Sequence, residues 1–181
     1  MAADSFENIV RVLLEAEGFW VQQSYKVELP QPIKNQLGKP TMPRVEIDIL
    51  AFDQSRNLVN VIEVKSYLDS TGVRLSDVKQ TFTTPTGRYK LFTCAGYQAA
   101  VLLQLKEQLQ VTGMVNQDTR FRLGLVFGKL YAKDAAAIAR HARANRWFFW
   151  LSQAVKRKLS RQVTRQYEND PAILAAKVLL R

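Results

Sequence analysis

The sequence contains one cysteine, one histidine and no long apolar run. Cys94 alone cannot form an internal disulfide, which fits a reducing compartment, and its apolar surroundings predict a packing role. His141 has no Cys or His companion, which argues against a zinc site. No apolar stretch approaches the roughly 20 residues of a membrane span, and the first residues lack the pattern of a signal peptide. We therefore expect a cytoplasmic protein with no membrane partner.

Acidic residues are also scarce. The chain has 26 Lys and Arg against 16 Asp and Glu, a formal net charge of +10 and a pI near 9.9. No acidic residue occurs between Asp134 and Glu168. A merely solvated helix surface usually mixes the two signs, whereas charge of one sign is typical of a phosphate-contacting surface. The composition therefore favours a nucleic acid, either DNA or RNA, over an anionic membrane as the partner.

Asp48, Glu63 and Lys65 stand within two strand-like runs, at 44–52 and 58–65. Both runs are rich in β-branched residues, and the polar segment 53–57 between them predicts a hairpin. Because side chains alternate across a strand, Glu63 and Lys65 share one face, and Asp48 shares a face with Leu50. If the register joins these faces, two carboxylates and one ammonium meet. Carboxylates are hard oxygen ligands suited to Mg²⁺, so the arrangement suits metal-assisted phosphodiester hydrolysis.

The same residues have a plainer interpretation. Glu-x-Lys on a half-exposed strand is often a cross-strand charge pair. The run from Val59 to Val64 is strongly apolar, however, and charges in a buried strand are costly unless they have a purpose. Glu46, two residues before Asp48, is either an additional ligand or an exposed edge residue, and we favour the second.

Asp48 with the Glu63-Val64-Lys65 tripeptide resembles the site of the PD-(D/E)XK nuclease superfamily, which has the restriction-endonuclease-like fold. The segment 5–21 is similar to the opening helix and strand of Mrr-type endonucleases and archaeal Holliday-junction resolvases, so the resemblance covers about residues 5–67. The usual proline before the motif aspartate is absent, since Ile47 stands there.

The resemblance implies that Asp48, Glu63 and the Val64 carbonyl bind Mg²⁺ or Mn²⁺. It also implies that Lys65 assists the attacking water or the transition state, and that Glu7 assists metal binding. Glu7 also fits a capping box with Asp4 as the N-cap, and the two roles are compatible.

The element order predicted from periodicity is α-β-β-β-α-β-α-β-α-α. Helices are expected at 5–17, 92–109, 135–144, 151–162 and 171–180, and strands at 19–29, 44–52, 58–65, 121–127 and 146–150. Segments 30–43 and 66–88 are expected to be loops. This order predicts an α/β fold with a central mixed sheet flanked by helices and a C-terminal helical addition, and the resemblance implies that its core is restriction-endonuclease-like. We expect a single domain over 1–181, with a core at about 5–130 and a basic extension at about 131–181. Most of the aromatic residues at 147–150 should be core rather than a base-stacking platform.

The sequence therefore predicts a metal-dependent endonuclease acting on DNA, with Asp48, Glu63 and Lys65 as its catalytic residues. The cations expected to contact nucleic acid are Arg74, Lys79, Arg88, Arg143, Lys156, Arg157, Lys158 and Arg161. The alternatives are a catalytically inactive nucleic-acid-binding protein and an interaction protein on the same fold. The sequence leaves substrate structure open, and a homodimer is compatible with it.

Overall fold

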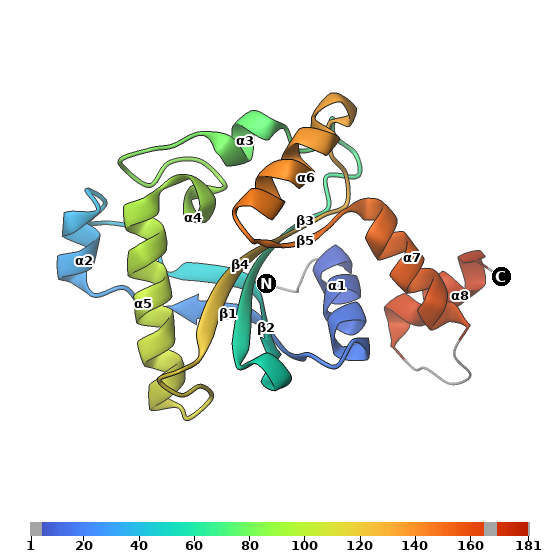
Figure 1. Cartoon of the computed structure of the whole chain (residues 1–181), viewed down its shortest axis with the longest axis horizontal. Coiled ribbons are helices and arrows are strands. Elements are labelled where there is room, and N and C mark those ends of the chain that lie inside the picture. The colour runs from blue at the N-terminus through green and yellow to red at the C-terminus, as the bar shows by residue number, and fades with distance from the viewer. Residues whose placement is uncertain (1–4, 165–169, 181) are drawn as a thin grey trace.

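The computed structural model describes residues 5–164 and 170–180, and it has a five-stranded mixed sheet with helices on both faces (Figure 1). The strands are β1 (Trp20–Val27), β2 (Val45–Asp53), β3 (Leu58–Lys65), β4 (Arg120–Phe127) and β5 (Phe148–Trp150), and they lie in this order across the sheet. β1, β2 and β3 pair antiparallel, whereas β3, β4 and β5 pair parallel. The predicted hairpin of β2 and β3 is confirmed, and the short 3₁₀ helix η1 (Gln54–Arg56) forms its turn.

Two helices cover opposite faces of the sheet. α1 (Ser5–Ala16) places Val10, Leu13 and Leu14 against Ile49 and Ile62. On the other face, α5 (Ala95–Val111) packs Tyr97, Val101 and Leu105 against a second cluster that includes Val59, Val61 and Leu123. Figure 1 shows α5 and α1 on either side of the sheet. Side chains at odd positions of β3 therefore face α5, and those at even positions face α1.

The connection between β1 and β2 contains a helix where the residue pattern predicts a loop. α2 (Gln31–Gln36) forms in the segment 30–43 because Pro32 sits in its first turn, where a missing N–H costs no hydrogen bond. The predicted long helix at 92–109 is also divided: α4 (Lys90–Thr93) ends at Cys94, whose backbone is extended, and α5 begins at Ala95. Cys94 is buried in the α5-side cluster, so its packing role is confirmed.

The segment after β3 is anchored to the end of β4. It contains α3 (Leu75–Lys79), in a stretch where a loop is predicted. Val73 accepts a hydrogen bond from Tyr131 and donates one to Lys129. Two glycines allow this close approach: a Cβ on Gly128 would lie 2.3 Å from the Ser66 carbonyl oxygen, and one on Gly72, which has φ of 88°, would lie 2.5 Å from the Leu130 carbonyl carbon. The rim beside the end of β3 is thus a packed segment.

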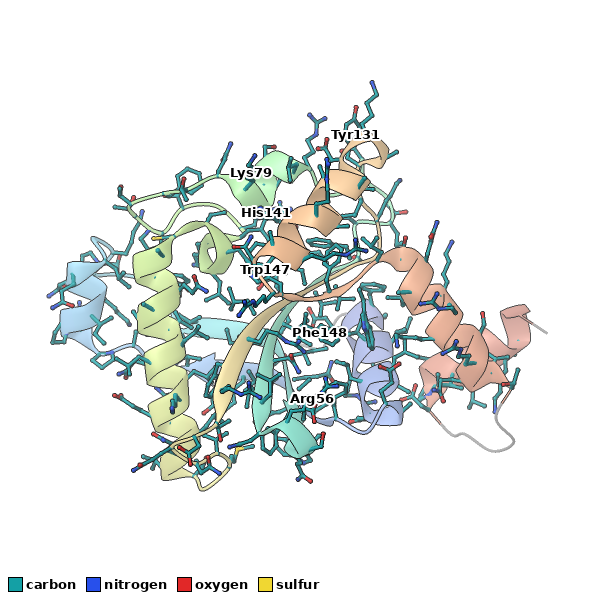
Figure 2. The ribbon with its side chains drawn as sticks, in the orientation of Figure 1. Arg56, Lys79, Tyr131, His141, Trp147 and Phe148 are labelled. Atoms are coloured by element: carbon teal, nitrogen blue, oxygen red, sulfur yellow. The ribbon has the colours of Figure 1, made fainter. Side chains whose placement is uncertain are left out.

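The C-terminal part contributes a strand as well as helices. The 3₁₀ helix η2 (Ala132–Asp134) leads into α6 (Ala135–Ala144), which is followed by β5, α7 (Ser152–Val163) and α8 (Pro171–Leu180). Phe148 and Trp150 are buried against the α1 face, whereas Trp147 and Phe149 pack partly buried on the other face, so the core role of these aromatic residues is confirmed. Figure 2 shows Phe148 between the sheet and α1, and Trp147 beside His141 near α6. Within residues 5–164 and 170–180, no helix is long and apolar enough to cross a membrane.

Candidate functional site

Asp48, Glu63 and Lys65 meet where β2 and β3 separate. The last paired residues of the two strands are Ile49 and Ile62, so the next residues, Asp48 and Glu63, stand just beyond the ladder. The pairing of β1 with β2 is also interrupted opposite Asp48, where Ser24 has a φ of 51°. These interruptions free the end of β2 from β3 and leave room for the Asp48 side chain to reach β3.

The Lys65 ammonium lies between the two carboxylates. Its Nζ is 3.1 Å from Asp48 Oδ2 and 2.8 Å from Glu63 Oε1, so these two oxygens are less than about 6 Å apart. Asp48 Oδ2 also accepts a hydrogen bond of 2.8 Å from the Val64 amide. The Asp48 and Glu63 side chains are each 15% exposed and that of Lys65 is 26% exposed. Among the described residues, no group donates a hydrogen bond to Asp48 Oδ1 or Glu63 Oε2.

With both carboxylates ionised, the cluster of Asp48, Glu63 and Lys65 carries a net negative charge. Burial and, after it, the Asp48 carboxylate raise the pKa of Glu63, and the opposing effect of Lys65 is smaller. Burial acts to lower the pKa of Lys65, but Glu63 and Asp48 outweigh it and the net effect is a raised pKa. Lys65 is therefore a permanent ammonium in this state. Two carboxylates against one ammonium leave an attraction for one more cation.

A backbone oxygen points toward the same gap. The Lys65 carbonyl accepts a hydrogen bond of 2.9 Å from the Gly128 amide, so it points toward β4. Successive carbonyls of a strand point in opposite directions, and the Val64 carbonyl therefore points toward β2, beyond the last Ile49–Ile62 pair. The gap is thus bordered by two carboxylates and one carbonyl, all oxygen donors.

Several residues beside the cluster carry no signal of a site in the sequence. Glu63 borders a cavity of about 120 Å³ whose other charged or polar lining residues are Arg44, Glu46, Arg88, Lys90 and Tyr97. Lys90 acts to lower the pKa of Glu63, and its ammonium lies 5.2 Å from the centre of the Tyr97 ring. Arg88 was predicted; Lys90 and Tyr97 were not, because α4 and α5 bring them to Glu63 only through the tertiary fold. Glu46 is exposed, which agrees with the favoured interpretation of an edge residue.

Glu7 lies in the first turn of α1 and is partly buried. The helix packs through Phe6 and Val10 on the sheet face that includes Ile62 and Val64, whereas Glu63 and Lys65 belong to the opposite face. The role of Glu7 in metal binding stays a prediction. The expected N-cap, Asp4, lies outside the described residues.

The predicted nucleic-acid-binding residues fall into two groups. Arg74, Lys79 and Arg88 belong to the segment after β3, and all three are exposed. Arg74 lies over the Tyr131 ring at 5.0 Å, and Arg88 donates a hydrogen bond of 2.9 Å to the Tyr67 hydroxyl. Figure 2 shows Lys79 on α3 and Tyr131 near the start of α6. Of the three, Arg88 lines the same cavity as Glu63 of the acid cluster.

The second group lies elsewhere. α7 packs through Val155 and Leu159 on the α1 face of the sheet, opposite the face of Glu63, so the structure does not bring Lys156, Arg157 and Arg161 together with the acid cluster. Lys158 pairs with Glu17 and lies 4.5 Å from the centre of the Trp150 ring. Arg143 is exposed on α6.

Comparisons with known proteins add little to this geometry. No family model matches the chain, and no curated protein matches it. A crystal structure of a protein of unknown function, AF1548, is similar with a TM-score of 0.46 and 15% identity, over 98% of this chain and 78% of that one. At this level the similarity identifies neither a family nor an activity.

Proposed function

We propose that the protein is a metal-dependent phosphodiesterase acting on DNA, an endonuclease built on a restriction-endonuclease-like core. The observation that carries the proposal is the meeting of Asp48, Glu63 and Lys65 at the open end of the β2–β3 ladder. Partly burying charged side chains at the end of an apolar strand costs free energy, which apolar residues there would not. A polar function at the site explains this cost.

The donor set fits a magnesium or manganese ion. Asp48, Glu63 and the Val64 carbonyl would hold it, and Mg²⁺ binds through one or two carboxylates while keeping several waters. Within residues 5–164 and 170–180 there is no cluster of three or more His, Cys, Asp or Glu side chains suited to a metal, which argues against a site that encloses the ion with protein ligands. When bound, the ion would polarise the phosphate and lower the pKa of a coordinated water.

Lys65 acts as a cation rather than as a general base. Because the two carboxylates raise its pKa, the side chain stays protonated at neutral pH. An ammonium here can orient a water through its N–H groups and stabilise negative charge that develops on the phosphate. Arg88 and Lys90, which border the same cavity as Glu63, can hold the phosphates on either side.

The alternative is a DNA-binding protein without hydrolytic activity. The observation that favours it is the ion pairing itself, since Lys65 contacts both carboxylates and could serve as a permanent counter-charge. The two functions differ in whether divalent ions bind at Asp48 and Glu63.

Metal binding and cleavage separate these functions. We expect calorimetry to detect Mn²⁺ binding that is abolished in Asp48→Asn and in Glu63→Gln, together with Mg²⁺- or Mn²⁺-dependent cleavage of at least one DNA in a panel of linear, branched and single-stranded substrates. Glu46→Gln is the matched control, because it removes an exposed carboxylate from the same cavity without touching Lys65. Metal binding that survives both site variants would show that the ion is held elsewhere.

The position of DNA can be tested with paired cation variants. Neutralising Arg88 and Lys90 should make the dependence of log affinity on log salt shallower by about 0.9 for each duplex phosphate that the protein no longer neutralises. Neutralising Lys156 and Arg157, on the other side of the sheet, should change the slope less. Equal effects would mean that DNA binds to both faces.

A further inference from the structure

The segment that follows Lys65 borders a second cavity, open to solvent, beside the acid cluster. Its volume is about 410 Å³, within the range of about 300–1,000 Å³ typical of ligand sites. We call it the Tyr67 pocket. The lining residues that matter here are Tyr67, Gln80, Phe82, Thr86, Arg88 and Tyr89.

The Tyr67 pocket adjoins the proposed hydrolytic site. Tyr67 is two residues beyond Lys65 in the chain. Arg88 borders both the Tyr67 pocket and the cavity of Glu63. If a nucleic-acid strand placed a phosphate beside Arg88, the base of the adjoining nucleotide would therefore be within reach of the pocket.

The lining combines aromatic rings with unused polar groups. Tyr67, Phe82 and Tyr89 contribute three rings, and Phe82 is 37% exposed although it is a large apolar side chain. Its amide donates a hydrogen bond of 2.7 Å to the Thr93 carbonyl, which ties this part of the loop to α4. Tyr89 is buried, whereas Tyr67 and Phe82 are held in place and partly open to solvent, so these two rings suit stacking against a flat group.

The Tyr89 hydroxyl is buried and makes no hydrogen bond of regular geometry among the described residues, although the Tyr67 hydroxyl lies beside it. Burial and, after it, the interaction with the Tyr67 hydroxyl raise the pKa of Tyr89, so the phenol stays protonated. A buried donor without an acceptor is uncommon in folded proteins. The group is therefore available to a ligand that carries a carbonyl or ring-nitrogen acceptor.

Tyr67 itself is held in an uncommon conformation. Its φ is 45°, in the left-handed region that bulky residues rarely occupy. The Arg88 guanidinium donates to its hydroxyl and lies 5.9 Å from its ring centre. The surrounding contacts thus fix the ring at the mouth of the pocket in an orientation that the backbone alone would not favour.

We propose that the Tyr67 pocket binds an unpaired nucleobase of the DNA strand whose phosphate lies at the acid cluster. The proposal rests on the proposed function, and it specifies the substrate class: single-stranded DNA or duplexes with an extrahelical base. Such a base offers a π-face to the aromatic rings and acceptors on its edge to Tyr89. In a fully paired duplex the base faces are stacked and the base edges are paired, so neither is offered to the pocket.

Binding without cleavage tests the pocket directly. In metal-free buffer, fluorescence anisotropy would compare a single-stranded oligonucleotide, the same strand with abasic sites, and a paired duplex. We expect Phe82→Ala to weaken single-strand binding on the order of tenfold while leaving the abasic strand and the duplex unchanged. Leu103→Ala, which shortens an exposed apolar side chain on α5 away from the pocket, is the control and should have no effect.

Two further variants separate ligand binding from folding. Thr86→Trp should fill the pocket from its exposed wall and weaken single-strand binding as Phe82→Ala does. Tyr89→Phe removes the buried hydroxyl and should leave thermal stability unchanged or higher. It should weaken binding of the strand with bases several-fold more than binding of the abasic strand.

Equal binding of normal and abasic strands by the parent, with no effect of Phe82→Ala or Thr86→Trp, would overturn the proposal. Base-dependent binding without any metal-dependent cleavage would support the pocket and contradict the hydrolytic function. Metal-dependent cleavage that these variants do not change would support the hydrolytic function and contradict the pocket.

Discussion

The two polar clusters on β3 are built in opposite ways. Near the start of the strand, Asn60 is completely buried; its Nδ2 donates to the Ala51 carbonyl and its Oδ1 accepts from Arg122 Nε. The Arg122 guanidinium then lies 5.6 Å from the centre of the Phe148 ring. At the other end, Asp48, Glu63 and Lys65 carry a surplus negative charge and carboxylate oxygens without donors among the described residues.

The difference separates a cluster that is satisfied within the fold from one that has groups left over for the proposed ligand. A buried polar group whose hydrogen bonds are all made within the protein stabilises one arrangement and offers nothing to a partner. A group with unused acceptors and unbalanced charge leaves free energy to be gained on binding a cation. The two clusters should therefore differ in their effects on activity, stability and pH dependence.

The largest expected difference is in activity. Asp48→Asn should lower the rate of metal-dependent DNA cleavage by about 10² to 10³-fold or more, the size found when one electrostatic group of an active site is removed. Asn60→Ala, measured well below its unfolding temperature, should retain activity within a few-fold. Single-turnover rates at saturating Mn²⁺ provide the measurement, and comparable reductions in the two variants would erase the distinction.

Lys65→Met should produce the largest change in stability. Without the ammonium, two carboxylates that are mostly buried face each other, and the free energy of unfolding should fall by about 2–4 kcal/mol in metal-free buffer. Mn²⁺ should restore part of this stability and bind more tightly than to the parent, because no ammonium competes with it. Denaturant titrations with and without Mn²⁺ measure both effects; a stable variant that does not respond to metal would contradict the electrostatic account.

Asn60→Ala should destabilise the protein by about 1–3 kcal/mol, because the Ala51 carbonyl and the Arg122 guanidinium are both left without a buried partner. Divalent ions should not restore the stability of this variant. The same denaturant titrations with and without Mn²⁺ check the prediction. Recovery by metal would mean that the two ends of β3 are coupled.

The smallest effect concerns pH. Glu63 has a raised pKa in the folded protein, so its protonated form favours folding, and that contribution disappears as pH rises from the unfolded pKa through the folded one. Glu63→Gln cannot ionise. Its stability relative to the parent should therefore increase as pH rises above the ordinary glutamate pKa of about 4.3, when unfolding is followed in metal-free buffer. A constant difference from pH 4 to 8 would show that Glu63 has an ordinary pKa.

Local sequence patterns predicted the elements that carry the acid cluster. The β-branched runs and the polar turn of β2 and β3 lie close together in the chain, so alternation alone placed Glu63 and Lys65 on one face. The helix at 135–144 and the last helix, at 171–180, were predicted with their observed bounds. These successes concern features that are determined within about 20 residues.

The missed features depend on longer-range packing. Nothing local indicates that α5 should begin at Ala95 rather than continue from α4, since the apolar spacing runs through Cys94. The approach of Lys90 and Tyr97 to Glu63 and the placement of α7 on the opposite sheet face both depend on how distant elements dock. Charge counting along α7 showed a basic helix but gave no information about the face on which it packs.

The position of the backbone after Lys65 depends on Gly128, a residue with no side chain. Because its Cα faces the Ser66 carbonyl at a distance that excludes a Cβ, while its amide holds the Lys65 carbonyl, any replacement must displace the backbone that follows Lys65. In a mutational scan, position 128 would then respond like Asp48, Glu63 and Lys65 themselves. An engineer redesigning this surface should keep that glycine fixed before altering any charged side chain.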